Sequence, residues 1–149
     1  MAMLTSANPE ATRAIGAAWG QSATSGLVIG LSGDLGAGKT ELVKGLAEGL
    51  GTPVRVHSPT FSLLNEYRGG RVTLFHLDLY RLDKPSDVLG AGLDDFLFEP
   101  AGISVVEWIE RWLGPDGTAS SRRPRQYRHV RMRVLDSGVR QIEYDDFGP

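Results

Sequence analysis

A glycine-rich octapeptide near the start constrains the fold of this chain more than any other segment. Residues 33 to 40 read Gly-Asp-Leu-Gly-Ala-Gly-Lys-Thr, which fits the pattern G-x-x-x-x-G-K-[ST]. Glycines let consecutive backbone N–H groups turn toward one point and bind an anion. In loops of this kind the lysine reaches the β- and γ-phosphates, and the threonine hydroxyl ligates Mg²⁺. We therefore expect nucleotide phosphates to be held by Asp34, Leu35, Gly36, Ala37, Gly38, Lys39 and Thr40.

The residues on either side of the octapeptide supply the secondary structure that such a loop requires. Residues 27 to 31 form a short apolar run, which is typical of a buried parallel strand. After the loop, apolar residues recur at helical spacing up to Leu50, and Gly51 can end that helix. The order strand, loop, helix favours a phosphate-binding loop over a glycine-rich turn that binds nothing.

The composition is that of one ordinary globular domain. The chain has 149 residues, of which 41% are hydrophobic and 23% charged, so we expect residues 1–149 to form a single domain. A net charge of -2 argues against bulk electrostatic binding to nucleic acid or to an anionic membrane. The lack of cysteine excludes disulfides and thiolate metal sites. We see neither a signal peptide nor an apolar run of about 18 residues, and we expect a cytoplasmic protein without membrane association.

The rest of the chain alternates between predicted helices and strands. A helix begins at the capping sequence Asn8-Pro9-Glu10. One predicted hairpin joins strands at 61–67 and 72–78, and a second spans about 128–144 with Asp136-Ser137-Gly138 at its turn. The remaining predictions are strands at 54–56 and 103–107, short helical segments in 84–98, a helix at 108–113 and a loop at 114–125.

These elements together predict an α/β fold of the P-loop NTPase class. Its central sheet should be mostly parallel and flanked by helices, and the hairpins should add antiparallel strands. We find neither internal repeats nor a linker long enough to divide the chain into domains.

Two predicted strands end in an acidic residue. Asp78 ends the run that begins at Val72, and Glu107 ends the run that begins at Ile103. Because the carboxyl ends of parallel strands meet at the ligand crevice, both carboxylates can approach one Mg²⁺ ion beside the phosphates. The alternative is that each acid is only an exposed charge at a strand end. The phosphate-binding loop favours the metal role for both.

Three further residues have both a functional and a plain structural interpretation. Thr60, in the turn Ser58-Pro59-Thr60, offers a hydroxyl to Mg²⁺ or to the γ-phosphate, as switch segments do; such a turn is also commonly only a turn. Trp108 beside Glu107 fits core packing. His76 should share the strand face of Asp78, and it is more typical of a satisfied core histidine than of a catalytic base.

Together these segments resemble the bacterial TsaE family. The resemblance rests on the octapeptide, on Ser-Pro-Thr-Phe at 58–61, on His-Leu-Asp-Leu-Tyr-Arg-Leu at 76–82, and on Glu-Trp at 107–108, in matching order and spacing. It covers residues 6 to about 113. It implies a small Mg-dependent ATPase, weak alone and stimulated by partners, that is needed to form N6-threonylcarbamoyladenosine in transfer RNAs reading codons that begin with adenine. It also implies docking on a complex of the TsaB and TsaD proteins, with tRNA reached only through that complex. ATP hydrolysis would reset the complex between turnovers.

The resemblance also implies a role for each matching residue. Lys39 matches the family's phosphate lysine, and Thr40 matches its Mg²⁺ hydroxyl. Asp78 matches a Walker B-type aspartate, and Glu107 matches a second acid near the metal. Lys39, Asp78 and Glu107, with Thr60 as a switch-like threonine, are thereby expected to carry hydrolysis, and Thr40, Asp78 and Glu107 to hold the metal.

The nucleotide-binding set implied by the family extends to other parts of the chain. Trp108 matches a tryptophan that the family needs for function, and the adenine pocket is expected near Ser6 to Thr12, with Thr12 as a contact. Glu41 also belongs to this set, but it stands where a second threonine is common. Its negative charge in the first turn of the helix should lower phosphate affinity. The seven arginines of 122–140 are either a solvated basic face or a surface for tRNA or an acidic partner.

Three functions remain open at this point. The first is an ATPase that acts on a partner complex, and the second is a small-molecule kinase whose lid uses the arginines of 122–125. The third is a nucleotide-gated binding module in which ATP occupancy, rather than hydrolysis, is the signal.

Overall fold

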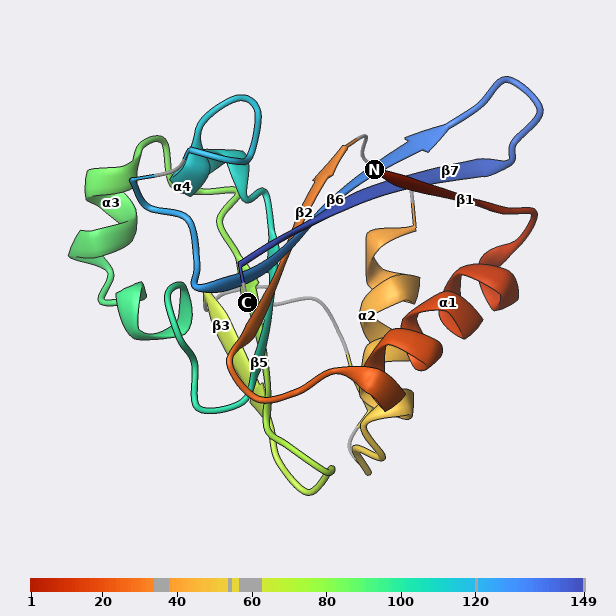
Figure 1. Ribbon diagram of the computed structural model, residues 1–149, viewed down its shortest axis with the longest axis horizontal. Helices are drawn as coiled ribbons and strands as arrows, with labels where there is room; N and C mark the ends of the chain where they lie inside the picture. Colours follow the sequence, from red (N-terminus) through yellow and green to blue (C-terminus); the bar gives the residue numbers. More distant parts are fainter. Residues whose placement is uncertain (34–37, 54, 57–62, 120, 149) are drawn as a thin grey trace.

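The computed structural model of the chain contains a twisted seven-stranded sheet with helices on both faces (Figure 1). It describes residues 1–149 except 34–37, 54, 57–62, 120 and 149. The strands are β1 (Ala2–Ser6), β2 (Leu27–Gly33), β3 (Leu64–Tyr67), β4 (Leu74–Asp78), β5 (Ile103–Glu107), β6 (Gln126–Val134) and β7 (Arg140–Phe147). Their order across the sheet is β1-β7-β6-β2-β5-β4-β3.

The sheet is parallel at its centre and antiparallel at both edges. Strands β6, β2, β5 and β4 are parallel neighbours, whereas β7 and β1 on one side and β3 on the other pair antiparallel. The predicted mostly parallel sheet is therefore confirmed only for the central strands, and the whole sheet is mixed. The carboxyl ends of β2, β4 and β5 lie at one edge, where Asp78 is directly opposite Glu107.

The helices form two layers that cover opposite faces of the sheet (Figure 1). One layer holds α1 (Pro9–Ser22) and α2 (Lys39–Gly49), and the other holds α3 (Pro85–Gly90), the short 3-10 helix η1 (Asp94–Phe96) and α4 (Glu110–Leu113). Alternate residues of β2 face the two helical layers. Ile29 packs in the core under α1 and α2, and Val28 packs in the core under α3 and α4. None of the described helices has the length and apolar character required to cross a membrane.

Helix α1 begins as its sequence predicts and packs very closely on α2. The Oδ1 atom of Asn8 accepts a hydrogen bond from the backbone N–H of Ala11 at 2.8 Å, and Pro9 occupies the first turn. Glycines permit the close approach of the two helices. A Cβ at Gly16 would overlap the carbonyl oxygen of Leu42, and a Cβ at Gly45 would overlap that of Arg13. Backbone therefore lies against backbone between α1 and α2.

Most predicted elements are present, and their boundaries differ. The first predicted hairpin is β3 with β4, and the second is β6 with β7. Both strands of the first hairpin are shorter than predicted among the described residues. The helix predicted from Trp108 begins only at Glu110, because Trp108 has a positive φ that no α-helix accommodates.

The short strands differ from the prediction in two respects. Arg55 and Val56 are not in a strand, and Val54 lies outside the described residues. Conversely, β1 was not predicted. It alternates between exposed and partly buried residues and pairs with β7, from the far end of the chain, so its pairing is a long-range contact that local pattern does not reveal.

Candidate nucleotide-binding site

A cleft of about 490 Å³ lies where β4 and β5 end and α2 begins. Every predicted site residue that the structure describes lines this cleft. Asp34, Leu35, Gly36, Ala37 and Thr60 fall outside the described residues. The predicted residues in the lining are Thr12, Gly38, Lys39, Thr40, Glu41, Asp78, Glu107 and Trp108. Pro9, Tyr80 and Arg140 complete the lining, and none of these three was predicted from the sequence to belong to the site.

Lys39 presents its ammonium group within the cleft while nearly buried. Its side chain is in the first turn of α2, and the residue is 6% exposed. The Nζ atom donates to the carbonyl oxygen of Gly33 at 3.1 Å and lies 4.6 Å from the centroid of the Trp108 ring. Gly38, just before the helix, has a φ of 96° that a side chain would disfavour. The start of α2 thus brings a helix N-terminus and a fixed cation to one point, which can bind an anion such as phosphate.

Trp108 adopts a backbone conformation that is unusual for its residue type. Its φ is 61°, and it is the one residue other than glycine with a positive φ in the described parts of the chain. Such a conformation costs on the order of 1–3 kcal/mol and persists only where its surroundings enforce it. The ring of Tyr80 lies 5.0 Å from the Trp108 ring, and the guanidinium of Arg111 lies 5.5 Å from it. The strained backbone thereby places an aromatic face against the ammonium group of Lys39.

The two predicted acids are neighbours on adjacent strands. The Oδ1 atom of Asp78 accepts a hydrogen bond from the backbone N–H of Tyr80 at 3.0 Å. Burial raises the pKa of Asp78 above its ordinary value, the Glu107 charge raises it further, and the Tyr80 hydrogen bond opposes the rise. Glu107 is 7% exposed, and its Oε2 atom lies 2.6 Å from Nε2 of His76. Both carboxylates are therefore taken partly out of water.

The donor atoms of the cleft are of the kind that Mg²⁺ prefers. Thr40, Asp78 and Glu107 all offer oxygen, and magnesium usually takes one or two carboxylates while water and phosphate supply the other ligands. Within the described residues, no group of three or more His, Cys, Asp and Glu side chains could hold a metal ion. The oxygens of Thr40, Asp78 and Glu107 thus fit a metal ion that a phosphate group also ligates. A cation beside Asp78 would favour the ionised form of its carboxyl group.

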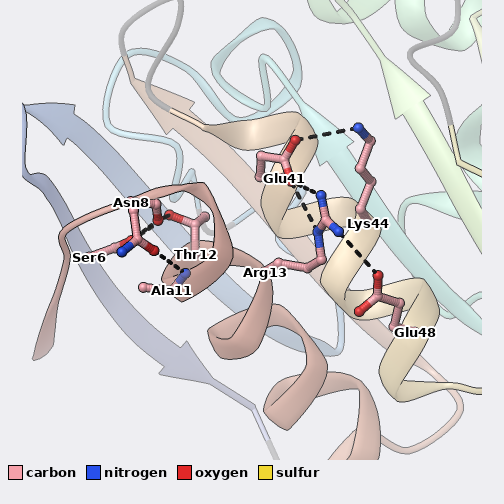
Figure 2. A network of polar contacts seen from close by, with 8 residues as sticks. All are labelled: Ser6, Asn8, Ala11, Thr12, Arg13, Glu41, Lys44 and Glu48. Atoms are coloured by element: carbon pink, nitrogen blue, oxygen red, sulfur yellow. Dashed lines mark hydrogen bonds and ion pairs between the residues drawn. The ribbon is translucent and has the colours of Figure 1, made fainter.

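Glu41 brings its negative charge into the cleft as part of an ion-pair network (Figure 2). Its Oε2 atom accepts from Nε of Arg13 at 3.1 Å and from Nη2 at 2.7 Å, and its Oε1 atom lies 3.4 Å from Nζ of Lys44. Arg13 also lies 3.7 Å from Glu48. The hydrogen bonds from Arg13 hold the pKa of Glu41 below its usual range. The network joins α1 to the first turn of α2 and offsets the negative charge of Glu41, which was expected to weaken phosphate binding.

The segment predicted to hold adenine forms another part of the lining. Pro9 and Thr12 face the cleft, and the Thr12 hydroxyl lies 2.7 Å from that of Ser6 (Figure 2). Ser6 is opposite Arg140 in the pairing of β1 with β7. The N-terminal strand and the last strand therefore meet at this part of the cleft. Pairing between such distant segments left no sign in the local sequence.

The arginines of the 122–125 loop contact other parts of the chain. Arg122 donates to the carbonyl oxygen of Trp112 at 2.8 Å, and Arg123 lies 4.4 Å from the ring of Phe147. Arg125 lies 3.5 Å from Glu99. Of the seven arginines between 122 and 140, Arg140 is the one in the cleft lining that the described residues form. In this conformation, the arginines of the 122–125 loop consequently do not form the lid over the phosphates that a kinase would need.

Comparison with known proteins identifies the family. The family model for Threonylcarbamoyl adenosine biosynthesis protein TsaE matches residues 6–142. The chain belongs to the TsaE family. The match confirms the resemblance found from the motifs and extends it to residue 142, within β7.

Individual TsaE proteins align over much of the chain. The tRNA threonylcarbamoyladenosine biosynthesis protein TsaE of Nostoc sp. (strain PCC 7120) is 42% identical over 144 residues, which cover 95% of this chain and 83% of the Nostoc protein. The protein of the same name from Bacillus subtilis (strain 168) is 48% identical over 101 residues, or 68% of this chain and 62% of its own length.

A solved structure supports the α/β fold. The crystal structure of YdiB from Bacillus subtilis superposes with a TM-score of 0.73 at 31% identity, covering 96% of this chain and 83% of that one. The mixed sheet and its flanking helices are therefore an arrangement shared with a known structure.

Proposed function

We propose that this TsaE-family chain is a P-loop ATPase that serves the formation of N6-threonylcarbamoyladenosine in transfer RNA. The names of its relatives support the role in this modification. The observation that carries the ATPase assignment is the convergence of the predicted residues on one cleft, with Lys39, Asp78 and Glu107 in its lining.

Lys39 and the start of α2 would bind the phosphates of ATP. The Lys39 ammonium already lies beside Gly33 and is held on the Trp108 ring, so little side-chain freedom is lost when a phosphate binds. A bound phosphate would also accept from backbone N–H groups at the N-terminus of α2. Pro9, Thr12 and Arg140 line the same cleft and would contact the remainder of the nucleotide.

Thr40, Asp78 and Glu107 would hold Mg²⁺ beside the phosphates, with Thr60 as the switch-like contact. When bound, the ion neutralises charge that develops on the phosphoryl oxygens. The register of β4 against β5 places the two carboxylates side by side, and their partial burial strengthens their interaction with any cation in the cleft.

The lining supports slow hydrolysis by the isolated chain and stimulation by partners. Its carboxylates among the described residues are Glu41, Asp78 and Glu107. Two of them are needed for the metal, and Glu41 is occupied by Arg13 and Lys44. No separate general base for the attacking water is left in this described part of the lining. We propose that docking on the TsaB–TsaD complex completes the site, that tRNA is reached through that complex, and that hydrolysis resets it.

The deciding experiment measures ATP hydrolysis by the purified chain alone and with TsaB and TsaD added. We expect low activity alone and a marked rise with both partners. Brisk turnover by the isolated chain would contradict the proposal that partners complete the site.

The same lack of a separate base among the described lining residues also favours a second function, a nucleotide-gated binding module. In that case Asp78→Ala and Glu107→Ala should still support tRNA modification, provided that ATP still binds. Loss of modification with ATP binding intact would exclude this second function.

A further inference from the structure

His76 is a buried polar residue of β4 next to the cleft. It has no solvent exposure, and it precedes Asp78 by two residues in β4, so the two side chains share one face. Directly opposite His76 on β5 is Val105, which belongs to the core under α1 and α2. A histidine at such a position requires a hydrogen-bond partner.

The partner is the carboxylate of Glu107. The Nε2 atom of His76 lies 2.6 Å from Oε2 of Glu107, which is two residues beyond Val105 and lies diagonally across the strand pair. An ionised carboxylate can only accept, so the tautomer that suits an ionised Glu107 carries its proton on Nε2 and donates it. The Nδ1 atom is buried and has no hydrogen-bond partner in the described parts of the chain. Among the described residues, Glu107 is therefore the one hydrogen-bond partner of this imidazole.

We propose that His76 is a positioning residue for ATP hydrolysis, because its Nε2–H group fixes the orientation of the Glu107 carboxylate at the edge of the cleft. The inference rests on the function proposed above, in which Glu107 serves the metal. A glutamate has three rotatable side-chain bonds, so its oxygens take many positions unless something restrains them. The bond to one oxygen restrains the group and leaves its remaining lone pairs to the cleft that Glu107 lines. Partners of this kind commonly set the geometry of metal-binding side chains.

The test compares His76→Leu with His76→Gln. Leucine fills a similar space without a donor, whereas the glutamine amide can place an N–H group near the position of Nε2. We expect His76→Leu to lower the kcat of ATP hydrolysis by about tenfold or more, in line with the loss of partners behind metal-site residues. His76→Gln should recover most of the rate. Affinity for a fluorescent ATP analogue without Mg²⁺ should be unchanged in both variants, and the gain in that affinity on adding Mg²⁺ should be smaller in His76→Leu.

His129 provides a matched control. It is a buried histidine on β6 and bonds Oγ of Ser32 through Nε2 at 2.9 Å. Replacing it by leucine also removes a buried imidazole, yet it should leave kcat and the Mg²⁺ effect within about twofold of the parent. An equal loss in both leucine variants would show a general packing effect and overturn the proposal.

A double variant separates positioning from packing. If His76 acts through Glu107, His76→Leu should lower kcat no further in a Glu107→Gln background. Full additivity of the two losses would overturn the proposal. If His76→Leu does not fold, as thermal unfolding would reveal, His76→Asn replaces it, since the shorter amide cannot reach the position of Nε2. A His76→Asn variant as active as His76→Gln would then be the contrary result.

Comparison of Glu107→Gln with His76→Leu separates the positioning role of His76 from the proposed function. A Glu107→Gln variant with normal hydrolysis would remove the role of Glu107 and the inference together. A large loss in Glu107→Gln with none in His76→Leu would leave the proposed function standing and refute only the positioning role of His76.

Discussion

At the scale of single residues, Lys39 should decide whether the nucleotide binds. Its ammonium donates to the Gly33 carbonyl and lies over the Trp108 ring. Lys39→Ala should lower ATP affinity by about 100-fold or more, because hydrogen bonds to charged groups contribute roughly 1.5–3 kcal/mol each. Equilibrium titration with a fluorescent ATP analogue measures the change. Normal affinity in this variant would contradict the phosphate-binding role of the loop.

The Asp78 carboxylate should destabilise the folded chain at pH 7 while supporting ATP hydrolysis. Burial raises the pKa of Asp78, so the folded state binds the proton more tightly than the unfolded chain does. Below about pH 4 this tighter proton binding stabilises the folded state. The stabilisation is lost as the pH rises from the pKa of the unfolded chain, about 3.9, to the higher pKa of the folded chain. Asp78→Asn keeps an acceptor for the Tyr80 N–H and removes the buried charge. Without nucleotide or Mg²⁺ at pH 7, it should unfold at a higher temperature than the parent.

The same substitution should lower ATP hydrolysis by about 10²–10³-fold, the usual result of removing a preorganised charge. Thermal unfolding at pH 7 and at pH 4 tests the stability part, since the difference between variant and parent should shrink at the lower pH. A variant less stable than the parent at pH 7 would mean that the ionised carboxylate stabilises the fold instead.

The residues in the cleft divide into those that the sequence could predict and those that it could not. Lys39 and Thr40 belong to a contiguous motif, and Asp78 ends an apolar strand, so local pattern and the family resemblance were enough. The bond between His76 and Glu107 joins residues on different strands, and Arg140 reaches the cleft through the pairing of β7 with β1. Such contacts depend on strand order and register, which local pattern does not contain.

At the scale of secondary-structure elements, the contact between α1 and α2 should tolerate no added side chain. A Cβ at Gly45 would overlap the carbonyl oxygen of Arg13, whereas Gly90, at the end of α3, has open space around it. Gly45→Ala should therefore destabilise the fold by about 1–3 kcal/mol, the usual range for overpacking. Gly90→Ala should be neutral or slightly stabilising. Chemical denaturation of both variants measures the difference, and equal stability would show that the helices can move apart freely.

Elements with strong local signals were predicted well. Asn8 and Pro9 marked the start of α1, and apolar runs marked β2 and β5. The strand expected at 54–56 shows the limit of this reasoning, because Val56 is buried without being in a strand. An apolar residue between polar ones can fill the core from an irregular segment, and short runs do not separate the two cases.

At the scale of the whole molecule, ATP should stabilise the fold. The cleft is built from α1, α2, β4, β5 and β7 together, so a ligand in it binds the folded chain and not the unfolded one. At 100 times its dissociation constant a ligand adds about 2.7 kcal/mol, which corresponds to a rise of about 5–10 °C in Tm for a chain of this size. Differential scanning fluorimetry with Mg²⁺ and ATP measures the shift. Lys39→Ala should show none, and an equal shift in that variant would place the ligand elsewhere.

Because β1 pairs with β7, this edge of the sheet cannot form until β7 has been synthesised. Of the described strands, β1 is synthesised first, and its sheet neighbour β7 is synthesised last. A nascent chain therefore carries the lysine loop and both acids well before Arg140 reaches the cleft. The part of the cleft where β1 meets β7 can therefore form only after β7 has been synthesised.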